Sequence, residues 1–165
     1  MIQIVKDSDT RPWFFLQTAH TTYGMRVMET GHLEHLYYGE RITVDAQDFA
    51  SCAPLVIQRA FAPGNTCTYD KEHPQISMED ICLEVGTLGK GDIREPFLEV
   101  RFADGSVTSD FTFDSYEVIT LKEREQCLQD SGLPHSYSEA ETDSAECLQI
   151  VLQDVTNHLE LQLFY

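Results

Sequence analysis

The amino-acid sequence predicts an all-β protein, an antiparallel β-sandwich with little helix. Short apolar segments recur along the chain, and several are rich in β-branched and aromatic residues. Clusters of Gly, Asp, Asn, Ser, Thr and Pro separate these segments, as turns do in all-β folds. Helix signals are few. A chain of 165 residues has the length of one domain and can bury a core without disulfides or metals.

The N-terminal quarter of the chain predicts four consecutive strands. They are residues 1–6 (MIQIVK), 13–18 (WFFLQT), 21–28 (TTYGMRVM) and 32–39 (HLEHLYYG). DSDTRP forms the first turn, and Gly31 supplies the positive φ that the later hairpin turn needs. Trp13 is expected in the core or at a sheet edge. Tyr37 and Tyr38 adjoin on a strand, so one ring faces inward and the other outward, where it is available to stack on a sugar or a neighbouring subunit.

The middle of the chain mixes a helix signal with a strand signal. Residues 77–84 (SMEDICLE) begin with a capping-box pattern, which leaves both a short helix and a loop open. Residues 97–102 (FLEVRF) alternate cleanly, with Leu98, Val100 and Phe102 on one face, and predict a strand. ADGS then predicts a hairpin turn, and residues 107–120 return as one or two strands.

The C-terminal part predicts a loop and a hairpin. Residues 139–146 (EAETDSAE) read as a solvated acidic loop. Residues 147–154 and 159–165 predict two strands that flank the turn VTNH. The alternation of the last strand still runs at Tyr165, whereas domains usually end in a polar tail. We therefore expect a single β domain over residues 1–165 that is truncated at its C-terminal end.

Composition narrows the functional classes. The chain has 28 acidic against 11 basic residues and a net charge of −17, which disfavours nucleic acid and membrane surfaces as partners. Neutral sugars and basic proteins remain open. Five scattered cysteines without a CxxC pair argue against a disulfide framework or a zinc site. With no signal-peptide pattern and no apolar run of membrane-spanning length, these features predict a cytoplasmic protein.

Motifs for catalysis or cofactors do not stand out. GKGD lacks P-loop spacing, and neither GxSxG nor HExxH occurs. His32 and His35 would face opposite sides of a strand, which disfavours a shared metal. Four aspartates lie near expected strand ends, and turn chemistry explains each better than catalysis does: Asp92, Asp104, Asp110 and Asp114. We therefore assign no catalytic residue, no metal and no cofactor.

The best functional candidate is the glycine-rich loop GKGDIREP, residues 89–96. Gly89 and Gly91 permit backbone conformations that other residues avoid. Asp92 and Arg94 are two apart, so they point the same way in an extended segment. Either they pair and pin the loop, or Arg94 reaches a ligand or another chain while Asp92 orients it. The residues alone favour the first alternative, and the second makes Asp92 and Arg94 candidate substrate-binding residues.

Several of these motifs together resemble the opening of the family 36 glycoside hydrolases, the bacterial α-galactosidases. Residues 23–39 are similar to the family pattern Y-x-(M/F)-x-V…G-x-L-x-H-L-Y-Y-G. Residues 89–96 match G-x-G-D-(F/I)-R-x-P, and residues 98–106 match L-E-V-x-x-x-D-G-S. SGLPHSY and residues 148–165 continue the match in order. One departure is SMEDICLEVG, which stands where the family often has P-x-E-(Y/F)-P.

The resemblance implies the first part of an N-terminal β-supersandwich domain. In the family a (β/α)8 barrel follows and holds both catalytic aspartates of a retaining mechanism. The parent enzyme would hydrolyse terminal α-galactosides such as melibiose or raffinose, while this chain alone would be inactive. The domain would pack on its own barrel and help to form a homo-oligomer, often a tetramer. Its loops approach a neighbour's active site, which would bring Asp92 and Arg94 to a galactoside.

Two other functions stay open on the sequence. One is a free-standing carbohydrate-binding β-sandwich, which would need an outward aromatic platform and a complete sheet. The other is a transferase or phosphorylase-like relative that shares the β domain, and only the absent barrel would separate it from a hydrolase.

Overall fold

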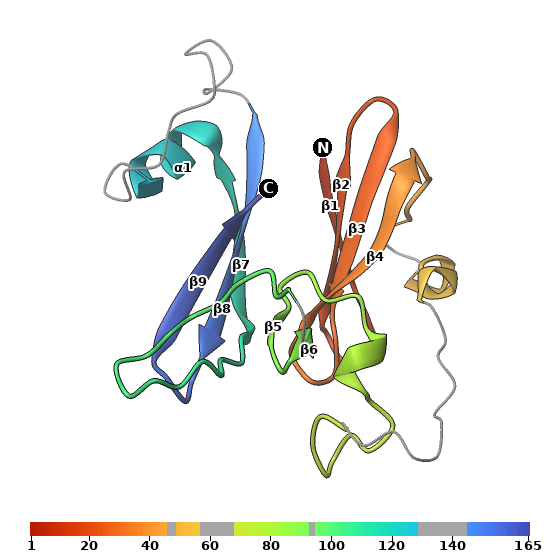
Figure 1. The fold of residues 1–165 in the computed structure, drawn as a ribbon. Coiled ribbons are helices and arrows are strands. Elements are labelled where there is room, and N and C mark those ends of the chain that lie inside the picture. Colours follow the sequence, from red (N-terminus) through yellow and green to blue (C-terminus); the bar gives the residue numbers. More distant parts are fainter. Residues whose placement is uncertain (46–48, 57–67, 93–94, 129–144) are drawn as a thin grey trace.

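The computed structural model describes residues 1–45, 49–56, 68–92, 95–128 and 145–165 (Figure 1). In these ranges two antiparallel sheets face each other, which confirms the predicted β-sandwich. The first sheet has the order β1-β2-β3-β4 and the second has the order β7-β8-β9. Residues 68–92 and 95–111, which precede the second sheet, gather at one end of the sandwich, the lower end in Figure 1.

The first sheet is the meander that the sequence predicts. Its strands are β1 (Ile2–Lys6), β2 (Pro12–Gln17), β3 (Thr21–Val27) and β4 (Leu33–Glu40). Each pairs antiparallel with the next. Gly31, in the turn between β3 and β4, has φ of 83°, as the hairpin requires. Gly24 allows the Phe15 ring to lie on the β3 backbone, because a Cβ there would stand only 3.1 Å from a ring carbon.

The second sheet closes over the first and encloses the main core. Its strands are β7 (Thr112–Thr120), β8 (Glu146–Asp154) and β9 (Leu159–Phe164). Phe14 of β2 meets Tyr116 of β7 edge to face, with ring centroids 5.1 Å apart. The buried core residues are Phe14, Met25, Val27, Leu33, Val85, Phe111, Leu148, Ile150 and Leu152.

The outer face of the first sheet is also buried. Trp13 and Phe15 point away from the second sheet and pack against the segment that follows β4. That segment contains two short 3-10 turns, η1 (Phe49–Ser51) and η2 (Ala53–Leu55). The Trp13 ring meets Phe49 edge to face at 4.9 Å. Burial on both faces explains why β2 is a continuous apolar run, and it confirms Trp13 as a core residue.

The strand predicted at residues 97–102 is wrong. Leu98 makes a single bridge to Thr87, and the rest of the segment has no ladder. Leu98, Val100 and Phe102 are half-buried while Glu99 is exposed, so the alternation reflects contact on one side without a partner strand. The ADGS turn that follows is confirmed, with Gly105 at φ of 89°.

The structure decides the alternative left open for residues 77–84 and adds one helix that the sequence did not predict. Residues 77–84 form only one 3-10 turn, η3 (Met78–Asp80), and Ser77 makes no side-chain cap. An unpredicted helix, α1 (Leu121–Leu128), follows β7 directly. Thr120 caps it, since its hydroxyl accepts from the Glu123 amide at 3.2 Å while the Glu123 carboxylate accepts from the Thr120 amide at 2.8 Å. In the described ranges no helix is long and apolar enough to cross a membrane.

Candidate functional site

The candidate loop begins in two very short strands, β5 (Thr87–Leu88) and β6 (Gly91–Asp92), which pair in parallel. Arg94 lies outside the described residues, and for Asp92 only the backbone is described. The sequence expectation that these two side chains pair with each other, or act on a ligand, therefore stays a prediction.

A tight turn defines the base of this loop. The amide of Thr87 donates to the Lys90 carbonyl at 3.2 Å, and the Lys90 amide donates back at 3.0 Å. Gly89, between them, has φ of 78°, a conformation that a side chain would strain. The Thr87 hydroxyl donates to the carbonyl of Ser109 at 2.7 Å, which joins the turn to the segment that leads into β7.

Asp110 collects three side chains from three distant segments. His32 Nε2 lies 2.8 Å from one carboxylate oxygen, and the Tyr69 hydroxyl donates to the other at 3.1 Å. The Lys90 ammonium lies 3.2 Å from that second oxygen and 4.7 Å from the centre of the Tyr69 ring. We call these four residues the Asp110 hub. The turn explanation predicted for Asp110 is wrong, because its carboxylate binds side chains far away in sequence.

The hub is charged and partly removed from water. Burial acts to raise the pKa of Asp110, but the hydrogen bond and charge of His32, and then Lys90, hold that pKa below its ordinary value. Burial and the charge of Asp110 raise the pKa of Tyr69 to about 12. The hub therefore has an ionised carboxylate and a neutral phenol at neutral pH.

The other predicted aspartates have local roles. Asp104 accepts from the Ser106 amide at 2.9 Å, which confirms its place in a turn. Asp114 is exposed at the irregularity where β7 shifts register against β8. His32 is buried in the hub, whereas His35 lies beside Tyr23 with ring centroids 4.9 Å apart. The described residues contain no group of three His, Cys, Asp or Glu placed to hold a metal.

A second polar cluster joins the two sheets. The Glu84 carboxylate accepts from the Tyr23 hydroxyl of β3 at 2.6 Å and from the Tyr165 hydroxyl, just after β9, at 2.8 Å. The two phenol rings stack at 6.2 Å. We call these three residues the inter-sheet clasp. Burial and the carboxylate raise the pKa of both tyrosines above the ordinary value.

The two buried acids of the described ranges, Glu34 and Asp154, and the half-buried Glu84 have structural partners. Glu34 is bound by Arg26 at 2.6 Å, and Glu84 belongs to the clasp. Asp154 accepts from the amides of Thr156 and Asn157 in the last hairpin. A glycosidase needs two carboxylates that flank one substrate bond, and these side chains are instead directed to separate internal contacts.

Sequence reasoning missed the hub and the clasp. One local signal was available for the hub: the lysine of GKG follows a glycine that can take a positive φ, so a tight turn that presents the lysine side chain was foreseeable. Nothing local marks the clasp, because Glu84 is separated from Tyr23 by 61 positions and from Tyr165 by 81. The predicted difference between the two adjoining tyrosines is confirmed, since Tyr37 is half-buried and Tyr38 is 70% exposed. The contact of the exposed ring with a sugar or a neighbouring subunit stays a prediction.

Comparison with protein families matches residues 31–165 to the glycosyl hydrolase family 36 N-terminal domain. The bifunctional alpha-galactosidase/sucrose kinase AgaSK of Mediterraneibacter gnavus is 35% identical over 153 residues. Alpha-galactosidase AgaA of Geobacillus stearothermophilus is 30% identical over 152 residues. Both matches cover 92% of this chain but 15% and 19% of the relatives. The chain thus spans about a fifth, or less, of the length of these proteins.

Solved structures agree over the same region. The galactosidase domain of AgaSK superposes with a TM-score of 0.74 at 31% identity, covering 98% of this chain and 21% of that one. The alpha-galactosidase from Lactobacillus brevis superposes with a TM-score of 0.76 at 31% identity, covering 98% and 20%. The sandwich fold is therefore shared with one section of much longer chains.

Proposed function

Since the chain belongs to the glycosyl hydrolase family 36 N-terminal domains, we propose that it is the non-catalytic sandwich of an α-galactosidase that hydrolyses terminal α-galactosides of the melibiose or raffinose type. One observation carries this proposal: the chain aligns along 98% of its own length with a section of α-galactosidases five times longer. The retaining chemistry and its two carboxylates would lie in a (β/α)8 barrel of the same enzyme.

The partners of four buried or half-buried acids support a non-catalytic role. Glu34, Glu84, Asp110 and Asp154 are each held by donors of the domain itself. A general acid or a nucleophile must instead face the bond that it cleaves. The domain's contribution is then scaffold, contact with the barrel and contacts in a homo-oligomer, which we propose to be a tetramer. The free thiols of Cys82, Cys127 and Cys147 are consistent with a cytoplasmic enzyme.

The activity test uses the full-length product of the gene beside the 165-residue chain. We expect hydrolysis of p-nitrophenyl α-galactoside and raffinose by the full-length protein alone. Hydrolysis by the 165-residue chain would overturn the non-catalytic assignment. A full-length protein that releases no galactose, or that forms only transfer or phosphorolysis products, would overturn the hydrolase assignment.

We further propose that the glycine-rich loop forms part of the rim of a neighbouring subunit's galactoside pocket, with Arg94 toward the sugar and Asp92 orienting it. The anchored base of the loop supports this role, because a binding group needs a rigid support. In the full-length enzyme Arg94→Ala should raise KM or lower kcat while the melting temperature stays unchanged. A lower melting temperature with unchanged kinetics would make Arg94 a structural pin.

One observation favours the alternative of a free-standing carbohydrate-binding module. Tyr38 is 70% exposed and lies beside Tyr23, with ring centroids 6.0 Å apart, so it offers an aromatic face to a sugar ring. Titration of the 165-residue chain with galactose and raffinose separates the two functions. Binding that Tyr38→Ala abolishes would support the module, whereas the galactosidase domain predicts no binding at Tyr38.

A further inference from the structure

The Asp110 hub ties the glycine-rich loop to both sheets at once. His32 lies at the end of the turn that joins β3 to β4 in the first sheet. Asp110 lies two residues before β7 of the second sheet, and its amide donates to the Asp154 carboxylate of β8 at 3.1 Å. Lys90 is the member that belongs to the loop. Its position is therefore set relative to both halves of the sandwich.

Lys90 is bound by two different interactions. Its ammonium forms an ion pair with the Asp110 carboxylate, and the partial burial of Asp110 strengthens that ion pair. The same ammonium lies over the Tyr69 ring. The next two residues, Gly91 and Asp92, form β6, so a displacement of Lys90 displaces the strand that leads into the rest of the loop. The reciprocal Thr87 and Lys90 hydrogen bonds transmit the same constraint through the backbone.

We infer that Lys90 and Asp110 are positioning residues, which hold the glycine-rich loop where it can contact substrate and so contribute to the affinity for the galactoside. The inference rests on the proposed role of this loop at the rim of the active site. Neither residue touches the sugar. Their effect passes through the backbone of β6, and Asp110 acts as the fixed point because its other ligands, His32 and Tyr69, come from outside the loop.

The test combines hydrogen exchange with kinetics on the full-length gene product carrying Lys90→Met. This variant keeps the length of the side chain and leaves His32 and Tyr69 on Asp110, so the fold is retained. We expect faster exchange of the Thr87 and Lys90 amides with unchanged exchange in β2 and β3. We expect KM for the galactoside to rise about tenfold, the loss of one charged hydrogen bond, while kcat stays near the wild-type value.

Three further variants separate positioning from general stability. Lys90→Arg keeps the charge and the cation–π contact, so it should restore KM. Tyr69→Phe removes the hydroxyl but keeps the ring, and it should have a smaller effect on KM than Lys90→Met. Lys122→Met removes an exposed lysine from α1, at the opposite end of the sandwich (Figure 1), and should change neither KM nor exchange at the loop.

Hydrogen exchange and KM test different parts of the inference. Unchanged exchange at Thr87 and Lys90 in Lys90→Met would overturn the positioning role, whatever the kinetics. Faster exchange with an unchanged KM would overturn the link from the loop to substrate. The absence of any galactosidase activity in the wild-type protein would refute the proposed enzyme itself, and the exchange measurement would still decide whether Lys90 holds the loop.

Discussion

The inter-sheet clasp allows a quantitative test of how the sandwich is held together. Tyr165→Phe removes the hydroxyl that donates to Glu84 at 2.8 Å and leaves the ring in place. A hydrogen bond to a charged group contributes about 1.5–3 kcal/mol. Because Tyr23 still donates to the same carboxylate, we expect a loss near the lower end, about 1.5 kcal/mol. This corresponds to a fall of about 3–6 °C in Tm for a domain of this size.

A double-mutant cycle makes the prediction sharper. Tyr23→Phe alone should cost a similar amount, since one phenol still serves Glu84. With both hydroxyls removed, a carboxylate that is only 11% exposed loses both phenol donors, and the double variant should lose about 1–3 kcal/mol more than the sum of the single losses. Urea unfolding of the three variants measures the unfolding free energies and shows whether the m-value stays constant.

Tyr37→Phe is the matched control for this cycle. Its hydroxyl also donates a hydrogen bond, at 2.9 Å, but to an exposed carbonyl of its own strand. We expect a change within about 0.5 kcal/mol. Additive losses in Tyr23→Phe and Tyr165→Phe, or a change in Tyr165→Phe as small as that of the control, would refute the clasp as a shared and desolvated acceptor site.

Three other expectations follow from local chemistry. Arg26→Met leaves Glu34, which is 4% exposed, without its partner, and should destabilise by about 3 kcal/mol or more in urea unfolding. Thr120→Ala removes the cap of α1 and should cost about 1 kcal/mol, with loss of helical circular dichroism. The raised pKa values of Tyr23 and Tyr165 stabilise the folded state below the ordinary value of 10.0, and this stabilisation is lost as pH rises through the folded pKa values. Phenolate absorbance should therefore appear in two classes, the later one coinciding with unfolding.

The sequence predicts strands correctly where an alternation of apolar and polar side chains is bounded by a turn signal. Residues 21–39 carry alternating side chains and a glycine at the turn, and β3 and β4 form there with Gly31 at positive φ. The segment 97–102 carries the same alternation but forms no ladder, since alternation reports a half-buried extended segment and says nothing about an adjacent strand. The helix α1 was missed although Thr120 and Glu123 have capping-box spacing, because β7 runs directly into it.

The candidate site was predicted less well, for a reason that a single sequence cannot overcome. Asp110 and His32 stand 78 positions apart, and Asp110 and Tyr69 stand 41 apart. Such contacts form only when the two sheets pack against each other, and the local periodicity of apolar residues does not encode that packing. The prominence of the glycine-rich loop was visible from its composition, whereas the role of Lys90 within it appears only once Asp110 is placed beside it.

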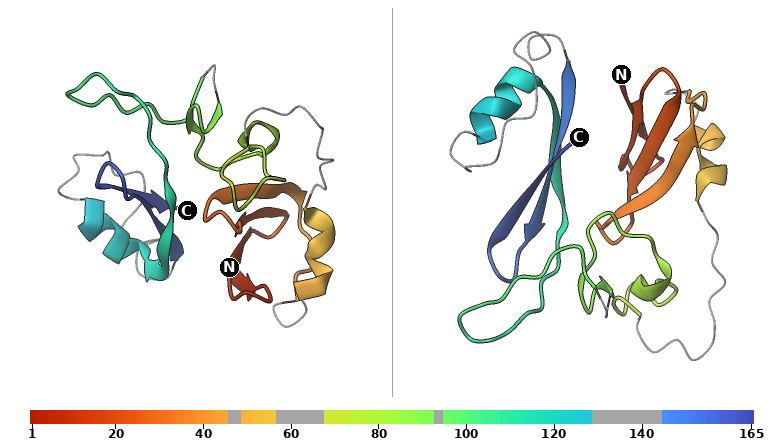
Figure 2. Two further views of the ribbon diagram at one scale, coloured as in Figure 1. Left: turned by 90° about the horizontal axis from the view of Figure 1, so that it is seen from below. Right: turned by 45° about the horizontal axis from the view of Figure 1, so that its top comes forward.

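The division of the chain into an early sheet and a late sheet has a consequence during synthesis. The first sheet ends at Glu40 and is built from hairpins between successive strands (Figure 2), so it can pair before the rest of the chain exists. Its inner face, with Phe14, Met25 and Leu33, is fully covered only when β7, β8 and β9 have all been added. At roughly 5–20 residues per second, the remaining residues take about 6–25 s to be added. For that interval the ribosome carries an apolar sheet without its cover, which is the kind of surface that promotes aggregation and that chaperones protect.

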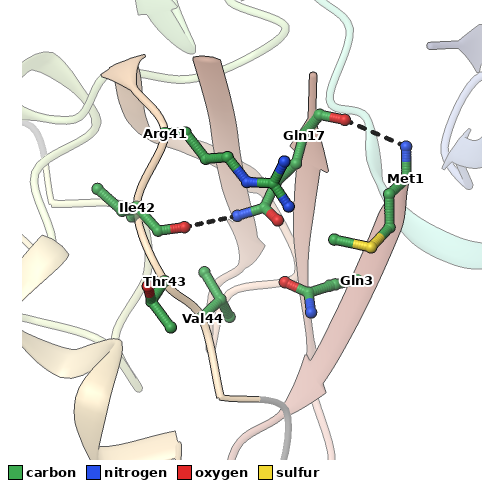
Figure 3. Close-up of a pocket in the computed structure, with 7 residues that line it drawn as sticks. All are labelled: Met1, Gln3, Gln17, Arg41, Ile42, Thr43 and Val44. Carbon is green, nitrogen blue, oxygen red and sulfur yellow. Dashed lines mark hydrogen bonds between the residues drawn. The ribbon is translucent and has the colours of Figure 1, made fainter. Parts of the chain in front are cut away.

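The hollow shown in Figure 3 adds to this picture of the early sheet. Gln17, at the end of β2, donates to the carbonyl of Ile42 at 2.8 Å, so the segment after β4 folds back on the outer face without any residue of the second sheet. The outer face of the meander can thus be covered by residues up to position 56, long before the inner face is. During synthesis the outer face of the first sheet is therefore covered first, and only its inner face stays exposed to aggregation.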